Sequence, residues 1–282
     1  MQRIAFINKK FVSFNKSFIH IEDRGFQFSD SVYEVIMIIN SKLIDFDFHI
    51  KRLKFSLSEL SINYQINKKY LNKIFIKLIK KNLINDGIIY LQITRGTQSR
   101  EHSYKKNIKP TIVAYTQKKK FNFPLKKFKA YKAITYPDLR WKRRDIKTTS
   151  LLPNILASSY ANKKNAYEAI FIQNNKVTEA SHSNVWIVKR KIIYTHPSNS
   201  NILKGITRTV IKKIILSENF LLKEKYFSLK QLYNADEIFI TSSGSLITPI
   251  NKIDNITINN GKIGVTTRLL AALLYKFYKK QI

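Results

Sequence analysis

The pattern of hydrophobic and polar residues changes period several times in the first half of the chain. Between residues 48 and 62, apolar side chains recur at three- and four-residue steps, as on one face of a helix. The same spacing predicts a second helix at 68–83, which ends before Asn85-Asp86-Gly87. Short apolar segments predict strands at residues 3–14 (two strands), 31–43 (interrupted at 40–41), 88–94 and 111–115. The first half therefore mixes helices with strands.

In the second half, strand and helix patterns alternate. Strands are predicted at residues 128–135, 169–173, 184–188, 192–195, 220–226 and 237–241. Helices are predicted at residues 151–164, 207–216 and 265–279, the last of them amphipathic and expected to pack against the protein. A basic, proline-containing segment at 118–127 is expected to link an N-terminal α+β domain (1–117) to a C-terminal domain (128–282).

Composition supports a folded protein and raises one alternative function. With 282 residues, 44% of them hydrophobic, the chain can bury a sizeable core. Its net charge of +33 would suit a nucleic-acid-binding protein. The excess consists of 40 Lys against 11 Arg spread along the chain, with frequent Ile and Asn, which favours a solvated basic surface produced by compositional drift. We therefore expect neither nucleic acid nor another polyanion as a partner.

The absence of cysteine restricts the available chemistry. It excludes disulfides, thiol nucleophiles and thiolate metal sites, and no His and carboxylate cluster has metal-ligand spacing. The first 18 residues lack the apolar run of a signal peptide, and no segment approaches the roughly 20 apolar residues of a membrane span. We expect a cytoplasmic protein without a membrane anchor.

Four polar segments could together form a site for covalent lysine chemistry. Lys147, in Asp145-Ile146-Lys147, could form a Schiff base if its amine sheds its proton, with pyridoxal phosphate as the usual partner. Glu179 lies among small hydroxyl residues and could hold a pyridine nitrogen protonated. Residues 204–208 lead into a helix whose N-terminus suits a phosphate, and hydroxyl groups at 241–245 could face the same phosphate. Each segment alone is more typical of an ordinary cap or turn.

Taken in order, these and other motifs resemble one enzyme family over nearly the whole chain. The motifs are Glu22–Phe28, Val32–Val35, His49–Leu53, Gln92–Thr97 with Arg100 and His102, Arg140-Trp141, Asp145–Lys147, Thr178-Glu179, Ile202–Arg208 and Thr248-Pro249. Their order is similar to that of the class IV aminotransferases, which use pyridoxal 5'-phosphate, and is closest to the D-amino acid branch of that family. The resemblance implies an α+β fold of type IV, with a smaller N-terminal α/β domain and a larger C-terminal domain that has a β-barrel-like core. It also implies that the cofactor binds at the domain interface.

The resemblance also implies a role for each matching residue. Lys147 would be the Schiff-base lysine and would later move the proton between the substrate Cα and the cofactor. Glu179 would pair with the pyridinium nitrogen, and Leu203 would lie against the ring. The cofactor phosphate would be held by Arg52, Ile206, Thr207 and Ser243.

Three further residues bear on the substrate. In the D-amino acid branch, Tyr33, Arg100 and His102 would bind the α-carboxylate, with Arg100 and His102 supplied by the neighbouring subunit of a homodimer. The expected reaction converts D-alanine and 2-oxoglutarate to pyruvate and D-glutamate. An L-branched-chain aminotransferase and an aminodeoxychorismate lyase on the same scaffold remain alternatives.

Three positions depart from the family pattern. Ser29 and Ser31 replace the glycines of a Gly-Asp-Gly motif, and Ala180 replaces the glycine that follows the cofactor-pairing glutamate. A side chain at a position of positive φ would strain the backbone by about 1 kcal/mol or more. We expect such strain to affect substrate fit rather than the fold. His182 has no assigned role, and His49 is expected to order local structure.

Overall fold

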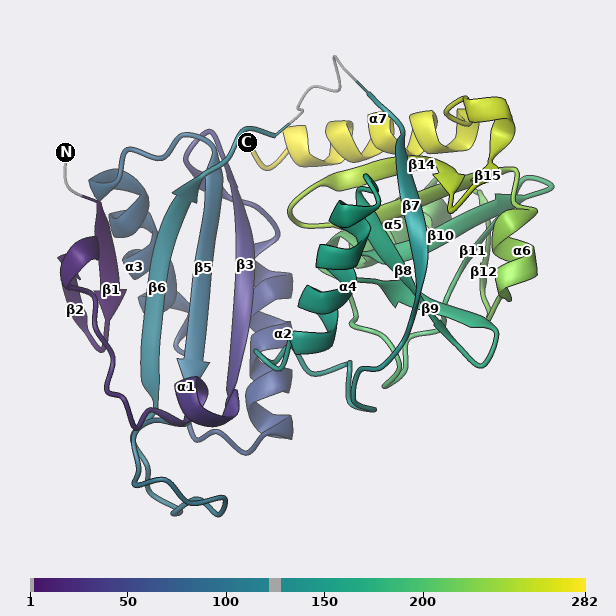
Figure 1. Cartoon of the computed structure of the whole chain (residues 1–282). Helices are drawn as coiled ribbons and strands as arrows, with labels where there is room; N and C mark the ends of the chain where they lie inside the picture. The colour runs from purple at the N-terminus through teal and green to yellow at the C-terminus, as the bar shows by residue number, and fades with distance from the viewer. Residues whose placement is uncertain (1–2, 122–127) are drawn as a thin grey trace. The chain divides into compact units, whose positions relative to one another are not determined.

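The computed structural model describes residues 3–121 and 128–282, which form two compact units (Figure 1). The first unit comprises the described residues up to Phe121, together with Ile146–Ser150 and Gln281–Ile282. The second comprises the described residues up to Asp145 and then Leu151–Lys280. Of the linker expected at 118–127, residues 122–127 lie outside the described part of the chain.

The first unit is built on an antiparallel sheet of six strands in the order β2-β1-β6-β5-β3-β4. The strands are β1 (Ile4–Ile7), β2 (Lys10–Ser13), β3 (Ser31–Ile39), β4 (Lys42–Leu43), β5 (Gly87–Thr94) and β6 (Thr111–Lys118). The helices are η1 (Phe14–Lys16), α1 (Arg24–Phe28), α2 (Phe46–Glu59) and α3 (Lys68–Lys81). Their bounds lie within a few residues of the predicted ones, except that the sequence pattern does not predict η1 and α1.

The predicted apolar faces of α2 and α3 form the core of this unit. Leu53 of α2 and Leu71 of α3 are buried in one cluster with Ile36, Ile89 and Leu91 of the sheet. Burying each such side chain stabilises the fold by about 1.5–3 kcal/mol. The helices therefore cover one face of the sheet, and the partly buried rings of Tyr33, Tyr90 and Tyr115 lie on the other.

The second unit contains a mixed sheet of nine strands in the order β12-β11-β10-β13-β14-β7-β8-β9, with β15 paired to β14. The strands are β7 (Tyr131–Pro137), β8 (Glu168–Gln173), β9 (Lys176–Ala180), β10 (Asn184–Lys189), β11 (Ile192–Thr195), β12 (Leu221–Glu224), β13 (Glu237–Ser242), β14 (Leu246–Ile253) and β15 (Ile256–Thr257). The helices are α4 (Leu152–Lys163), α5 (Ile206–Ser217), α6 (Leu229–Tyr233), η2 (Asn259–Gly261) and α7 (Val265–Lys279).

This sheet curls so that its two edges approach each other. The N–H of Val177 in edge strand β9 donates to the carbonyl of Phe227, 3.0 Å away, just beyond the opposite edge strand β12. Lys176 and Ser228 form an adjacent antiparallel bridge. Inside lies an apolar cluster that includes Phe227 and Ile240. The barrel-like core expected for the C-terminal domain is confirmed.

The elements that the pattern fails to predict have local causes. Helices α1 and α6 have five residues each, which is too short to show a helical period. Strand β14 carries Pro249 in its interior, a residue normally confined to edges because it cannot donate to the ladder. Here Pro249 lies in a central strand, between β13 and β7.

Candidate active site

Lys147 lies on a short extended segment that continues the sheet of the first unit. The N–H of Tyr33 donates to the Lys147 carbonyl at 3.0 Å, and Val32 and Thr148 form an antiparallel bridge. The N–H of Lys147 donates to the buried hydroxyl of Ser56 in α2 at 3.2 Å. Strand β3 and helix α2 thus fix the main chain of Lys147 from two directions.

The amine of Lys147 lies against an aromatic ring. Its Nζ is 4.2 Å from the ring centroid of Tyr33, whose ring stacks on Tyr90, which in turn stacks on Tyr115. Residues 33 and 90 lie on adjacent strands of the face opposite α2 and α3, because side chains alternate along a strand. The sheet therefore places the predicted Schiff-base lysine beside the predicted substrate-binding tyrosine.

Arg52 forms a buried ion pair with a residue to which the sequence assigned no role. Its Nε and Nη2 donate to the two carboxylate oxygens of Glu34 at 2.8 and 2.7 Å, and His49 Nδ1 lies 2.7 Å from the same carboxylate. Burial raises the pKa of Glu34, but Arg52 and His49 outweigh it and bring the pKa to about 2. Burial also lowers the pKa of His49, despite the opposing effect of Glu34. At neutral pH an ionised Glu34 thus orients Arg52 through a charge-assisted fork.

Arg100 and His102 lie in a loop of the first unit that contains neither helix nor strand. The ring of Phe28, at the end of α1, is in contact with both. The guanidinium carbon of Arg100 is 5.1 Å from the Phe28 centroid, and the His102 ring is 5.6 Å away. Both predicted carboxylate-binding side chains are exposed.

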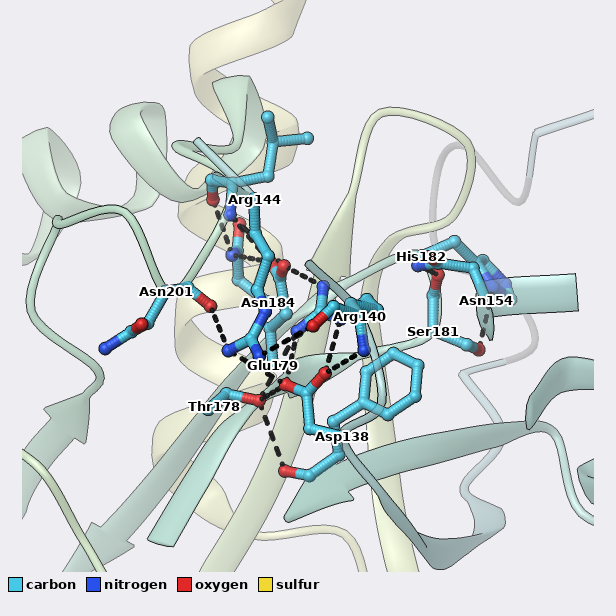
Figure 2. A network of polar contacts seen from close by, with 12 residues as sticks. Asp138, Arg140, Arg144, Asn154, Thr178, Glu179, Ser181, His182, Asn184 and Asn201 are labelled. Carbon is cyan, nitrogen blue, oxygen red and sulfur yellow. Dashed lines mark hydrogen bonds and ion pairs between the residues drawn. The ribbon is translucent and has the colours of Figure 1, made fainter. Parts of the chain in front are cut away.

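Glu179 lies in the second unit, on strand β9, where its buried carboxylate is surrounded by donors (Figure 2). Arg140 Nη1 donates to Oε1, and Asn184 Nδ2 donates to Oε2 at 3.1 Å. The N–H of Leu203 is 3.2 and 3.1 Å from the two oxygens. Burial raises the pKa of Glu179, and Arg140 opposes that shift. Glu179 and Leu203, each predicted to contact the cofactor, are therefore in direct contact with each other through the Leu203 main chain.

Arg140 bridges Glu179 to a second buried carboxylate. Its Nε and Nη2 donate to Asp138 at 2.9 and 2.8 Å, and the hydroxyl of Thr178 donates to Asp138 at 2.6 Å. Arg144 Nη1 approaches Asp138 at 3.2 Å. Burial raises the pKa of Asp138, but its bonds with Arg140 outweigh burial and bring the pKa below its ordinary value. The result is a row of alternating charges that ends at Glu179.

Helix α5 offers the features of a phosphate site at its N-terminus. Ile206 and Thr207 are its first two residues, and its N-cap Gly205 provides no side-chain cap. The hydroxyl of Thr207 is buried and has no hydrogen-bond partner among the described residues. A Cβ at Gly205 would approach Asn184 Oδ1 to 2.1 Å, so only glycine allows this close approach. Free N–H groups, an orphaned hydroxyl and the helix dipole fit the phosphate of the implied cofactor.

Two further sequence-derived residues have simpler surroundings. Ser243 lies in the turn between β13 and β14, beside a hydrogen bond of 2.7 Å between the hydroxyls of Ser242 and Ser245. His182 is half-exposed. Its N–H donates to the buried Glu168 at 2.6 Å, which fixes the turn after β9.

Sequence reasoning missed the residues that surround the predicted ones. Glu34 lies inside the Val32–Val35 motif without an assigned role, and Asp138 and Asn184 lie outside the motifs, although the sequence places Asp138 and Arg140 two residues apart, shortly after a predicted strand. That spacing of opposite charges, beside a predicted strand, is the signal that could have indicated a buried pair.

The described residues, 3–121 and 128–282, contain no group of three or more His, Asp or Glu side chains placed to hold a metal ion. Within the same ranges, no helix is long and apolar enough to cross a membrane.

Comparison with known proteins places these features in a family. The family model described as amino-transferase class IV matches residues 31–253. Over 272 residues, the chain is 41% identical to the D-alanine aminotransferase of Staphylococcus aureus (strain MSSA476), covering 96% of this chain and 95% of that protein. Over 255 residues it is 40% identical to the D-alanine aminotransferase of Bacillus licheniformis, covering 89% and 88%.

Solved structures of other family members share the fold. The branched-chain amino acid aminotransferase of Escherichia coli superimposes with a TM-score of 0.90 at 20% identity, covering 99% of this chain and 95% of that one. The branched-chain aminotransferase of the archaeon Thermoproteus uzoniensis, solved with norvaline, gives a TM-score of 0.87 at 22% identity, covering 98% and 94%. At these identities the match concerns the fold alone. The family model and the D-alanine aminotransferases together show that the chain belongs to the class IV aminotransferases.

Proposed function

We propose that this chain is a D-amino acid transaminase that converts D-alanine and 2-oxoglutarate to pyruvate and D-glutamate. The observation that carries the proposal is its identity of about 40% to D-alanine aminotransferases over most of its length. As a class IV aminotransferase it uses pyridoxal 5'-phosphate. The amino group passes from the first substrate to the enzyme and then to the second, so one site serves both oxo acids in turn.

The bound cofactor supplies a carbonyl group that reacts with amines and a ring that accepts electrons from the breaking Cα–H bond. Lys147 would attach the cofactor through Nζ, and Glu179 would hold a proton on the ring nitrogen. For that task Glu179 must be anionic. Arg140 and the Leu203 N–H favour its anionic form against the effect of burial.

The remaining cofactor contacts are part of the same proposal. The hydroxyl of Thr207, which has no other partner among the described residues, would donate a hydrogen bond to the phosphate, as would the main-chain N–H of Ile206. Arg52, oriented by Glu34, and Ser243 would add a charge and a hydroxyl to the phosphate site. Leu203 would lie against the ring.

Lys147 would also move the proton that decides the stereochemistry. In the loaded site, Lys147 Nζ would take the proton from the substrate Cα and later return it, so that one amine would serve first as base and then as acid. Tyr33, next to Nζ, would donate its hydroxyl to the substrate carboxylate together with Arg100 and His102. Fixing the carboxylate determines which face of Cα meets Lys147, and hence which enantiomer reacts.

Homodimer formation and a cytoplasmic location complete the proposal. In this arrangement Arg100 and His102 serve the site of the neighbouring subunit. Several large apolar side chains of the first unit support an association surface, because they are strongly exposed: Phe18 at 79%, Ile21 at 75% and Phe26 at 72%. We also place the enzyme in the cytoplasm, because a chain without cysteine has no disulfides that require an oxidising compartment.

Visible absorption tests the reaction and the stereochemistry together. The purified protein with cofactor should be yellow, and the colour should bleach on addition of D-alanine but not of L-alanine. Lys147→Ala should lose the absorption of the lysine-bound cofactor. Turnover of L-leucine or L-valine without turnover of D-alanine would reject the proposal in favour of a branched-chain enzyme.

A further inference from the structure

Arg24 is a buried arginine whose three donor positions reach three different acceptors. It is the first residue of α1 and is 4% exposed. Its Nε donates to Asp30 at 2.9 Å. Its Nη1 donates to the carbonyl of Glu101 at 2.6 Å, and its Nη2 donates to the carbonyl of His102 at 3.0 Å. One guanidinium thus holds two consecutive main-chain carbonyls of the loop that carries Arg100 and His102.

The main chain at Arg24 is held in place by hydrogen bonds at the end of strand β5. Asp23 caps α1 by accepting from the N–H of Gly25 at 2.8 Å and from the hydroxyl of Thr94 in β5 at 2.9 Å. The N–H of Arg24 donates to the carbonyl of Gly96 at 2.9 Å. These bonds attach the short helix α1 to the end of strand β5, so the main chain from which the Arg24 side chain extends is fixed.

The counter-ion of Arg24 is also held in place. Arg95 Nε and Nη2 donate to the two oxygens of Asp30 at 2.7 and 3.0 Å. Its other donors reach the carbonyls of Leu60 and Ser61. Asp30 thus lies between two buried arginines, and its orientation directs Nε of Arg24 while the other two donor positions face the loop.

The loop depends on side chains for its shape. It has no helix or strand between residues 98 and 110, and Gln98 bridges it by donating to the carbonyl of Ser103 at 2.9 Å and accepting from the N–H of Lys105. Aromatic contacts complete the packing. The ring of Phe28 lies near the guanidinium of Arg24 at 4.8 Å, and Tyr104 lies 3.6 Å from that of Arg95.

We propose that Arg24 is a positioning residue for substrate recognition, which holds the main chain at 101–102 so that Arg100 and His102 present their side chains to the substrate α-carboxylate. This inference rests on the proposed function of these two side chains. Without the guanidinium, two carbonyls lose charge-assisted bonds and the loop samples more conformations. Ordering the loop would then oppose each binding event, because conformational entropy must be lost again.

The role is tested with Arg24→Met and Arg24→Lys in the cofactor-loaded enzyme. Arg24→Met should raise KM for D-alanine and for 2-oxoglutarate about tenfold or more, with a smaller change in kcat. Amide hydrogen exchange at residues 99–104 should become faster by a similar factor. Arg24→Lys should keep a raised KM, because a single ammonium cannot reach all three acceptors. A wild-type KM in either variant would overturn the proposal.

Arg3→Met is the matched control. Arg3 also donates to a main-chain carbonyl, that of Thr116 at 3.0 Å, and its guanidinium lies 3.8 Å from the Phe14 ring. It has no contact with the 99–104 loop in the described structure. We expect Arg3→Met to leave KM and the exchange of the loop unchanged, so an equal rise in KM there would overturn a specific role for Arg24.

A double-mutant cycle with Arg100→Met distinguishes the positioning role of Arg24 from the substrate-binding role of Arg100. If Arg24 acts through Arg100 and His102, the double variant should raise KM by much less than the product of the two single-variant fold changes. Multiplicative effects would overturn the positioning role. If Arg100→Met alone leaves KM for D-alanine unchanged, the proposed substrate site fails, whatever Arg24 does. Faster loop exchange in Arg24→Met with unchanged KM would leave Arg24 a purely structural residue and overturn the inference.

Discussion

Arg140→Met tests whether the neighbouring guanidinium of Arg140 determines the protonation of Glu179. The guanidinium is 7% exposed and pairs with Asp138 and Glu179, whose side chains are 0% and 6% exposed. Removing one partner of a buried ion pair costs about 3–5 kcal/mol, because the remaining charge is left without compensation. We therefore expect the cofactor-free variant to be less stable by about this amount at neutral pH.

The pH dependence of the loss identifies its cause. Burial already raises the pKa of Glu179 above its ordinary value of 4.5, and Arg140 is the main opposing group. Without Arg140 the folded state holds a proton on Glu179 over a wider range above pH 4.5, where the unfolded chain has released it. The folded state then binds more protons than the unfolded state, so stability falls as pH rises, by up to about 1.4 kcal/mol per pH unit.

Urea unfolding of wild type and Arg140→Met between about pH 5 and pH 8 measures this difference. The stability deficit should grow with pH in Arg140→Met and grow less steeply in Arg140→Met/Glu179→Gln, which removes one of the two carboxyls that Arg140 pairs; the other, Asp138, keeps its contact with Arg144. Arg143→Met is the control, because Arg143 pairs with Asp145 in a partly exposed position and should cost less than about 1 kcal/mol. A deficit that does not change with pH, or one whose slope Glu179→Gln fails to reduce, would show that protonation of Glu179 does not cause the loss.

Three further changes address separate sites. Thr207→Val removes a buried hydroxyl that has no partner in the described structure, so the stability of the cofactor-free protein should not change. The Kd for the cofactor, measured by equilibrium dialysis, should rise about tenfold. An unchanged Kd would argue against a phosphate contact. Burial raises the pKa of Glu168 above its ordinary value of 4.5, despite its contacts with His182. In urea titrations, the stability of wild type relative to Glu168→Gln should therefore fall as pH rises above 4.5. A rise would contradict the assignment of Glu168 as a buried carboxyl. Ser29→Gly should stabilise the protein by about 0.5–1 kcal/mol because Ser29 has a φ of 55°, whereas Ser31→Gly, in strand β3, should destabilise it; a lower Tm for Ser29→Gly would refute the strain.

The sequence predicts best what depends on local periodicity. Helices α2 and α3 were predictable because apolar residues at helical spacing must face a core, and the structure confirms both within a few residues. Pairings between distant segments leave no such trace. Nothing in the neighbourhood of Lys147 reveals that its carbonyl accepts from Tyr33 or that Ser56 receives its N–H.

Residues of the candidate site were predictable only where they match a family motif. Roles for Glu179 and Thr207 are predicted in this way. Asp138 lies outside the motifs and Glu34, although inside one, receives no role, yet each is buried against an arginine. The difference is physical. A group that contacts a ligand needs one particular chemistry at one position, but a supporting carboxylate can come from any segment that the fold brings within reach of the cation. Such support becomes visible only through burial and distance.

The three replaced glycines show how backbone conformation decides the effect of a substitution. Ser31 lies in strand β3 and Ala180 at the end of β9, and neither has positive φ, so the strain expected there is absent. Ser29 does have positive φ, as the residue that ends α1, and its N–H donates to the carbonyl of Arg24. The cost of about 1 kcal/mol is therefore confined to the helix that carries Arg24. If Arg24 positions the substrate loop, Ser29→Gly should relax α1 without altering the guanidinium contacts, and KM for D-alanine should stay within about twofold of wild type while stability rises.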